Sequence, residues 1–237
     1  MVKLIVLDWD DCIVQGSSEG YYACYADAIR ENAIEVDSGT LIRQVRALWG
    51  RPHRDVIASI IGATHPQLDS VVHAYEGLIF TDTFSRNLSL VPGSKEALLV
   101  LKKNYALAVA TGIPGHLLRE HLLPRFGMQN IFSSIISSSE LPDSARGKPY
   151  PDMLLRLLEK FAVLPSEALM VGDAQGDVLM AQAAGVPAVV VLTGQLTREG
   201  AEALGVQLVI TSVSALPSVM ENFKKDFNST LYNGVLP

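Results

Sequence analysis

The sequence predicts an α/β fold in which a doubly wound, mostly parallel sheet is interrupted by an all-helical insertion. A near-continuous apolar run, residues 2–7, opens the chain, and such a run is typical of a strand buried on both faces of a parallel sheet. From Glu19 to about Phe84 the apolar residues recur at helical spacing. Beyond Lys95 strand-like runs alternate with helical ones, which is the pattern of βαβ units.

Each element follows from its local pattern. The insertion is expected to hold helices around Tyr22–Ile29, Leu41–Leu48, Val56–Ile61 and Leu68–Ile79. After the turn at Pro92-Gly93, further helices are predicted at Lys95–Lys103, His116–Leu123, Pro151–Phe161 and Asp177–Ala184. Strands are predicted at Val2–Leu7, Tyr105–Ala110, Ile131–Ile136, Ala168–Val171, Pro187–Leu192 and Gln207–Ile210.

Composition argues against several classes of function. The chain has 237 residues, of which 49% are hydrophobic. With a formal net charge of -6, it lacks the excess of basic residues that is typical of proteins that bind nucleic acids or anionic membranes. Its apolar runs are too short to span a bilayer. Cys12 and Cys24 form no disulfide or metal-binding pattern, and we therefore expect a reducing, cytoplasmic location. The oligomeric state is not indicated.

Two acids mark the carboxyl end of the first strand. Because side chains alternate along a strand, Asp8 and Asp10 are expected on the same side, at the edge where open α/β sheets bind ligands. Like charges about 4 Å apart repel by roughly 4 kcal/mol at an effective dielectric near 20. A bound cation or a shared proton relieves that repulsion. A solvated strand end remains an equal alternative for these two acids alone.

Three more predicted strand ends carry polar residues suited to the same chemistry. They are Thr111 with Gly112, Lys148 between Gly147 and Pro149, and Asp173 with Asp177 one helical turn later. Each alone also fits an ordinary turn, a solvated loop charge or an acid at a helix N-terminus. Their joint occurrence at strand ends favours one shared site.

Together these residues resemble a known family, the haloacid dehalogenase-like (HAD) superfamily. Order, spacing and strand context resemble its four motifs at Asp8-Trp9-Asp10, Thr111, Lys148, and Gly172-Asp173 with Asp177. The phosphoglycolate phosphatase-like branch is similar at Pro92-Gly93, Gly147-Lys148-Pro149 and Gly172-Asp173-Ala174-Gln175-Gly176-Asp177. The resemblance implies a Rossmann-like core formed by residues 1–14 and 87–237. It also implies a helical cap domain of the C1 type at residues 15–86.

The resemblance further implies a hydrolase that acts on small phosphomonoesters, such as phosphoglycolate or a sugar phosphate. Asp8 would be the nucleophile that forms an aspartyl phosphate, and Asp10 the general acid and base. Lys148 would neutralise Asp8 and the phosphoryl oxygens, while Thr111 and the main chain near Gly112 would bind those oxygens.

The cofactor that the resemblance implies is Mg²⁺. The carboxylates of Asp8 and Asp173 and the main-chain carbonyl of Asp10 would hold the ion. Asp177 would position the metal or its waters.

Other branches of the superfamily fit less well. The dehalogenase and phosphonate-cleaving branches lack the second acid, which is Asp10 here. A phosphomutase of the β-phosphoglucomutase type carries a histidine shortly after the first motif, whereas Gly20 falls near that place and the first histidine is His53. This phosphomutase and a non-catalytic phosphometabolite-binding protein remain the alternatives. Receiver domains also combine clustered Asp, Thr and Lys, but in a different order.

Two features concern the substrate. Asp11-Cys12 stand where the family usually has Gly-Thr or Gly-Val, and Asp tolerates an unusual φ better than most residues. Basic residues gather in the insertion near Trp49, namely Arg43, Arg46, Arg51, His53 and Arg54. Arg51, in the Gly50-Arg51-Pro52 break, is the residue we expect to meet a second anionic group of the substrate. A solvated helix face explains any single arginine equally well.

Overall fold

A computed structural model describes residues 1–49 and 51–221. The chain forms two compact units, one of Met1–Ile13 with the chain from Leu90 onward, the other of Val14–Ser89. Within the described ranges, no helix has both the length and the apolar character that crossing a membrane requires.

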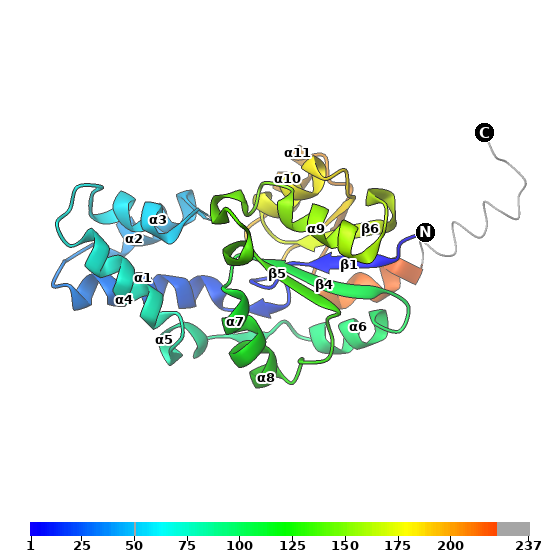
Figure 1. The fold of residues 1–237 in the computed structure, drawn as a ribbon, viewed down its shortest axis with the longest axis horizontal. Helices are drawn as coiled ribbons and strands as arrows, with labels where there is room; N and C mark the ends of the chain where they lie inside the picture. The colour runs from blue at the N-terminus through cyan, green and yellow to red at the C-terminus, as the bar shows by residue number, and fades with distance from the viewer. Residues whose placement is uncertain (50, 222–237) are drawn as a thin grey trace, which may run out of the picture. The chain divides into compact units, whose positions relative to one another are not determined.

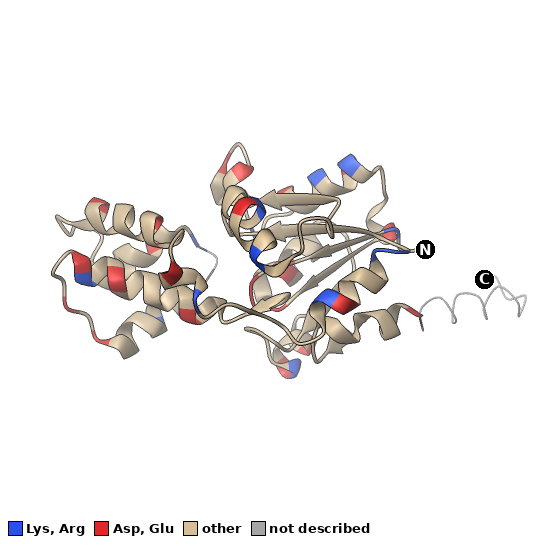
Figure 2. Ribbon diagram, turned by 90° about the horizontal axis from the view of Figure 1, so that it is seen from below, with Lys and Arg blue, Asp and Glu red and all other residues tan. Residues whose placement is uncertain are grey.

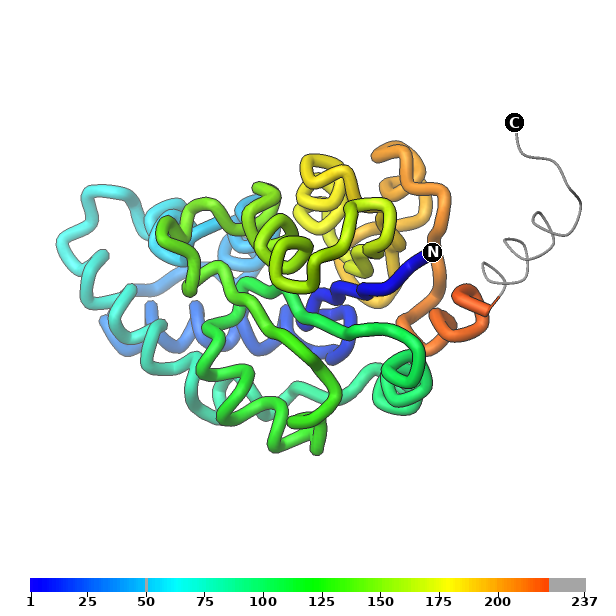
Figure 3. Tube along the Cα trace, turned by 45° about the vertical axis from the view of Figure 1, so that its right-hand side comes forward, coloured from blue at the N-terminus to red at the C-terminus, as the bar shows by residue number. Residues whose placement is uncertain are grey.

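The first unit is built on a six-stranded sheet with the order β5-β4-β1-β6-β7-β8. Its strands are β1 (Leu4–Leu7), β4 (Ala106–Thr111), β5 (Ser134–Ser137), β6 (Ala168–Gly172), β7 (Ala188–Val191) and β8 (Leu208–Ile210). Every neighbouring pair is parallel. In Figure 3 the blue start of the chain runs beside green and yellow segments that follow much later in the sequence. The predicted doubly wound parallel sheet is therefore confirmed.

Helices cover both faces of this sheet. Figure 1 shows α9 and α10 on one side and α6, α7 and α8 on the other. The α-helices of this unit are α6 (Ser94–Leu101), α7 (Gly115–Leu117), α8 (Leu123–Phe126), α9 (Asp152–Phe161), α10 (Gln175–Ala183) and α11 (Arg198–Ala203). Shorter 3₁₀ turns are η2 (Ser138–Glu140), η3 (Ser144–Arg146), η4 (Pro165–Glu167) and η5 (Val213–Ala215).

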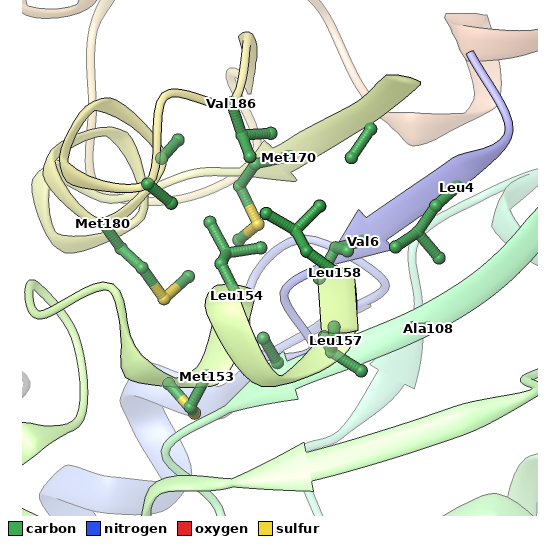
Figure 4. Packing of buried hydrophobic residues seen from close by; sticks show 14 of the residues in the cluster. Leu4, Val6, Ala108, Met153, Leu154, Leu157, Leu158, Met170, Met180 and Val186 are labelled. Carbon is green, nitrogen blue, oxygen red and sulfur yellow. The ribbon is translucent and has the colours of Figure 1, made fainter. Parts of the chain in front are cut away.

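The covering helices explain why the strands are apolar along their length. Leu4 and Val6 of β1 are fully buried and belong to one cluster with Met153 and Leu154 of α9 and Met180 of α10, as Figure 4 shows. The six strands of the sheet carry no charged residue, and Figure 2 accordingly draws them tan. A central strand with two covered faces has no solvated side on which a charge could lie.

The second unit is helical. It contains α1 (Ser17–Glu31), α2 (Ser38–Ala47), α3 (His53–Ile61), α4 (Leu68–Leu78) and α5 (Asp82–Ser85). Asp37 caps α2, since its carboxylate accepts from the Thr40 N–H at 2.8 Å. The stacked rings of Tyr25 and Tyr75, with centroids 4.3 Å apart, join α1 to α4. A separate two-stranded sheet pairs β2 (Val14–Gln15) with β3 (Ser89–Leu90).

Some predicted elements differ from the observed ones. The helix expected at His116–Leu123 is α7, a π-helical turn η1 (Leu118–Leu122) and α8 in succession. Pro124 lies in the first turn of α8, and because it has no N–H it donates no hydrogen bond to the preceding helical turn. The strand expected from Ile131 begins only at Ser134. Helix α11 was not expected, and its start depends on a cap in which Thr197 accepts from the Gly200 N–H at 3.1 Å.

Candidate functional site

The sheet register brings three polar strand ends together. Leu7 of β1 pairs with Val109 of β4 on one side and Val171 of β6 on the other. The Asp8 N–H continues this ladder with a 2.9 Å hydrogen bond to the Val171 carbonyl. Asp8 therefore follows the central strand at the edge where Thr111 ends β4. This is the edge at which doubly wound sheets bind ligands, next to the strand where the winding changes direction.

Lys148 joins two of the acids. Its Nζ lies 2.6 Å from Asp8 Oδ1 and 2.6 Å from Asp177 Oδ1, and it comes from the loop that precedes α9. Burial lowers the pKa of Lys148, but the carboxylates of Asp177 and Asp8 outweigh that effect and raise its pKa above the ordinary value. The lysine is therefore held in its charged form.

The acids outnumber the single lysine. One oxygen each from Asp8, Asp173 and Asp177 lies within 4.8 Å of the others, and all three residues are buried. Burial, opposed by Lys148 and reinforced by Asp177 and Asp10, raises the pKa of Asp8 to about 8. Burial together with Asp177 and Asp8 likewise raises the pKa of Asp173. The cluster thus carries more carboxylate than its own cation can balance.

A divalent cation would balance this excess of carboxylate charge. Carboxylate oxygens are the ligands that Mg²⁺ prefers, and the cluster offers three converging ones. The main chain holds the Asp177 carboxylate in place, because its Oδ2 accepts a hydrogen bond from the Ala174 N–H at 3.1 Å. An added Cβ on Gly172 would lie 2.4 Å from the Asp177 carboxyl carbon. Glycine at position 172 therefore makes room for the acid.

The turn after Asp8 has the backbone conformation that glycine usually supplies. Asp11 has a φ of 50°, and it is nearly fully buried. The Trp9 N–H donates to Asp8 Oδ1 at 2.7 Å, and the Ile13 N–H donates to the Trp9 carbonyl at 3.0 Å. Asp10 is half-buried within this turn. Aspartate adopts the left-handed region more readily than most residues, which is how the chain accommodates Asp11 here.

Thr111 and Gly112 lie on the neighbouring strand end. Thr111 is fully buried, and its Oγ1 accepts from the Ile113 N–H at 3.1 Å. A Cβ placed on Gly112 would meet nothing within 4 Å. The main chain at Gly112 therefore borders open space at the edge where Asp8 ends its strand.

The five basic residues that the sequence singled out in the helical unit have partners within that unit. Arg51 is 65% exposed and lies 3.6 Å from Asp55. The other contacts are Arg43 with Thr40 at 2.9 Å, Arg46 with Tyr22 at 3.0 Å, His53 with Glu76 at 3.0 Å and Arg54 with Asp69 at 2.6 Å. Gly50, in the predicted Gly50-Arg51-Pro52 break, lies outside the described residues. The substrate-binding role of Arg51 stays a prediction.

One segment of the site was not anticipated. The loop after β7 contacts both acid-bearing strand ends, through the hydroxyl of Thr193 and the main-chain N–H of Gln195. The available signal was a Thr-Gly pair at a strand end, Thr193-Gly194, which repeats the pattern of Thr111-Gly112.

Comparison with known proteins gives the family. The model of the haloacid dehalogenase-like hydrolases matches residues 2–185. The protein named "Probable phosphatase IndB" from Dickeya dadantii is 27% identical over 218 residues, which cover 90% of this chain and 91% of that protein. A phosphoglycolate phosphatase from Haemophilus influenzae is 41% identical over 105 residues, which cover 44% of this chain and only 45% of that protein.

Solved structures agree on the fold. A haloacid dehalogenase-like family hydrolase from Streptococcus pneumoniae superposes with a TM-score of 0.78 at 17% identity, covering 92% of this chain and 98% of that one. The segment matched by the family model includes Asp8, Thr111, Lys148 and Asp173. This chain belongs to the haloacid dehalogenase-like hydrolase family.

Proposed function

We propose that this protein, a phosphatase of the haloacid dehalogenase-like family, hydrolyses a small phosphorylated metabolite with Mg²⁺ through an aspartyl-phosphate intermediate. The observation that carries the proposal is the convergence of Lys148, Asp8 and Asp177 within 2.6 Å contacts, with Asp173 in the same cluster. Phosphoglycolate is one candidate substrate, because several relatives bear the name phosphoglycolate phosphatase.

Asp8 performs the first displacement. Its carboxylate forms a bond to phosphorus while the bond from phosphorus to the leaving oxygen breaks. Asp10 gives a proton to that oxygen, so the alcohol leaves neutral. Asp10 then takes a proton from a water molecule that attacks the phosphorus and releases phosphate from Asp8. The buried Lys148 ammonium balances the negative charge that gathers on Asp8 and on the phosphoryl oxygens.

Thr111 and Gly112 bind the phosphoryl group. The hydroxyl of Thr111 donates to a non-bridging oxygen, and the main-chain N–H near Gly112 adds a second donor. A Mg²⁺ ion held by Asp8, the Asp10 carbonyl and Asp173, with Asp177 beside them, would supply the positive charge that keeps Asp8 ionised and screens the phosphate.

The helical unit, Val14–Ser89, is proposed as the cap that selects the substrate, with Arg51 meeting a second anionic group. Hydrolysis is favoured over phosphomutase chemistry by the packing of Gly20. A Cβ at this position would lie 2.5 Å from the Phe84 carbonyl oxygen, so α1 has no room there for the histidine of the β-phosphoglucomutase type. Two buried free thiols, Cys12 and Cys24, support the cytoplasm as the proposed location.

The test is phosphate release by the purified full chain from a panel of phosphorylated metabolites, phosphoglycolate and sugar phosphates among them, with and without Mg²⁺. The proposal expects release from at least one member that depends on added Mg²⁺ and stops with a chelator. Transfer of phosphate between positions of one sugar would instead identify a phosphomutase. A panel that yields no phosphate in Mg²⁺ would contradict the hydrolase assignment.

A further inference from the structure

The loop after β7 contacts both acid-bearing strand ends of the site within four residues. The Thr193 hydroxyl donates to the Asp11 main-chain carbonyl at 2.5 Å. The Gln195 N–H donates to Asp173 Oδ2 at 3.0 Å, and the Leu196 N–H donates to the Asp173 carbonyl at 2.8 Å. One short segment therefore ties the end of β1 to the end of β6.

At Asp173 the loop limits how the carboxylate can move. Asp173 is only 2% exposed, and the Gln195 N–H holds one of its two oxygens. A Cβ on Gly194 would lie 1.8 Å from that same oxygen. The φ of Gly194 lies outside the left-handed region, so the backbone itself would accept alanine. It is the nearness of the carboxylate that requires glycine here.

At the other strand end the loop contacts the turn that follows Asp10. Asp11 has a positive φ, which a side-chain-bearing residue adopts at a cost. Asp11 is the residue directly after Asp10, and the main-chain carbonyl of Asp10 is one of the proposed Mg²⁺ ligands. The hydroxyl of Thr193 satisfies the main-chain carbonyl of Asp11, and so holds the peptide units that follow Asp10 in one orientation.

We propose that Thr193 and Gly194 are positioning residues that set the arrangement of the Asp8–Asp11 turn and the Asp173 carboxylate for Mg²⁺ binding. This inference rests on the proposed function, because it needs the carboxylate cluster to bind the ion. Partners that orient metal ligands typically change metal affinity by about 10- to 100-fold when they are removed. Neither residue touches the substrate in this account.

The experiment measures binding of Mg²⁺ alone, by calorimetric titration of the full chain without substrate. Thr193→Val keeps the shape of the side chain and removes the donor, so the Kd for Mg²⁺ should rise about tenfold. Thr193→Ser restores the hydroxyl and should bring the Kd back to near the wild-type value. Gly194→Ala should weaken binding at least as much, since its new methyl group displaces the Asp173 carboxylate.

A matched control separates positioning from general stability. Thr197→Val, four residues further on, removes the cap of α11 and should lower the free energy of unfolding. Its Kd for Mg²⁺ should stay at the wild-type value, because Thr197 caps the helix rather than either acid.

The outcomes are distinct. Weaker Mg²⁺ binding in Thr193→Val, rescued by Thr193→Ser and absent from Thr197→Val, supports the inference. Wild-type Kd values in both Thr193→Val and Gly194→Ala would overturn it and leave the proposed function standing. An equal loss in Thr197→Val would also overturn it, since the effect would then come from stability. A wild-type protein that binds no Mg²⁺ would overturn both the inference and the proposed Mg²⁺ dependence.

Discussion

At the scale of single residues, Lys148 supplies the positive charge that pairs with the buried carboxylates of the site. Its side chain is 14% exposed and contacts two buried carboxylates at 2.6 Å. Removing one partner from a buried ion pair leaves uncompensated charge and typically costs about 3–5 kcal/mol. We therefore expect Lys148→Met to lower the free energy of unfolding by about that amount in Mg²⁺-free buffer, as measured by urea denaturation.

The control is an exposed pair of the same length. Lys3 lies 2.6 Å from Glu167, but the lysine side chain is 61% exposed, and such pairs contribute about 0–1 kcal/mol. Lys3→Met should therefore change stability little. Similar losses in both variants would show that burial does not set the strength of the Lys148 contacts.

Glu140 gives a prediction about acid stability. Arg119 donates to both of its carboxylate oxygens, at 2.7 and 2.9 Å, and this pairing is the largest cause that lowers the pKa of Glu140 from its usual 4.5. A carboxylate with a lowered folded-state pKa stabilises the protein above its unfolded pKa. That contribution disappears as the pH falls through the folded-state value.

The variant Glu140→Gln should accordingly be less stable than wild type at neutral pH, by about 0.5–1 kcal/mol because the pair is partly exposed. The difference should shrink as the pH falls below about 4.5. Urea denaturation of both proteins across that range measures it. A difference that does not change with pH would mean that the charge of Glu140 contributes nothing.

At the scale of elements, α1 and α5 approach so closely that one position must be glycine. A Cβ on Gly20 would lie 2.5 Å from the Phe84 carbonyl oxygen and 3.0 Å from its ring. Overpacking of this kind costs about 1–3 kcal/mol, so Gly20→Ala should lower the free energy of unfolding by that amount. Gly77→Ala in α4 is the matched control, because a Cβ there meets nothing within 4 Å.

Gly77→Ala should instead leave stability unchanged or raise it by up to about 1 kcal/mol, since alanine is the better helix former. Thermal or urea unfolding of the two variants decides the matter. If Gly20→Ala is as stable as Gly77→Ala, the close approach of α1 to the Phe84 carbonyl does not constrain the helix.

The elements that the sequence predicted well are those with a buried face. Strands such as β6 and β7 are short apolar runs with clear ends, and α9 has apolar residues at regular helical spacing, so local pattern and tertiary packing agree. The π-helical turn η1 and the helix α11 were not predictable. Their boundaries depend on Pro124 and on the Thr197 cap rather than on hydrophobic periodicity.

At the scale of the whole molecule, topology explains why residues far apart in the chain could be expected to lie close together. Parallel strands end at the same edge, so Asp8 after β1, Thr111 at the end of β4 and Asp173 after β6 were expected to converge. Lys148 was expected beside Asp8 and lies 2.6 Å from it, whereas its contact with Asp177 was not expected. Thr193 was missed because its contact is made to a main-chain carbonyl, which sequence does not reveal.

The central claim is that Asp8 takes up the phosphoryl group and Asp10 releases it. The most direct measurement is mass spectrometry of the Asp10→Asn variant after incubation with Mg²⁺ and an aryl phosphate that the wild type hydrolyses, because an aryloxide can leave without the proton that Asp10 gives to an alcohol. Without the Asp10 base the second step should slow by about 10²- to 10⁴-fold, so the peptide containing Asp8 should gain the mass of one phosphoryl group. The Asp8→Asn/Asp10→Asn double variant should gain none. Phosphorylation at another residue, or none while the wild type turns over, would contradict the account.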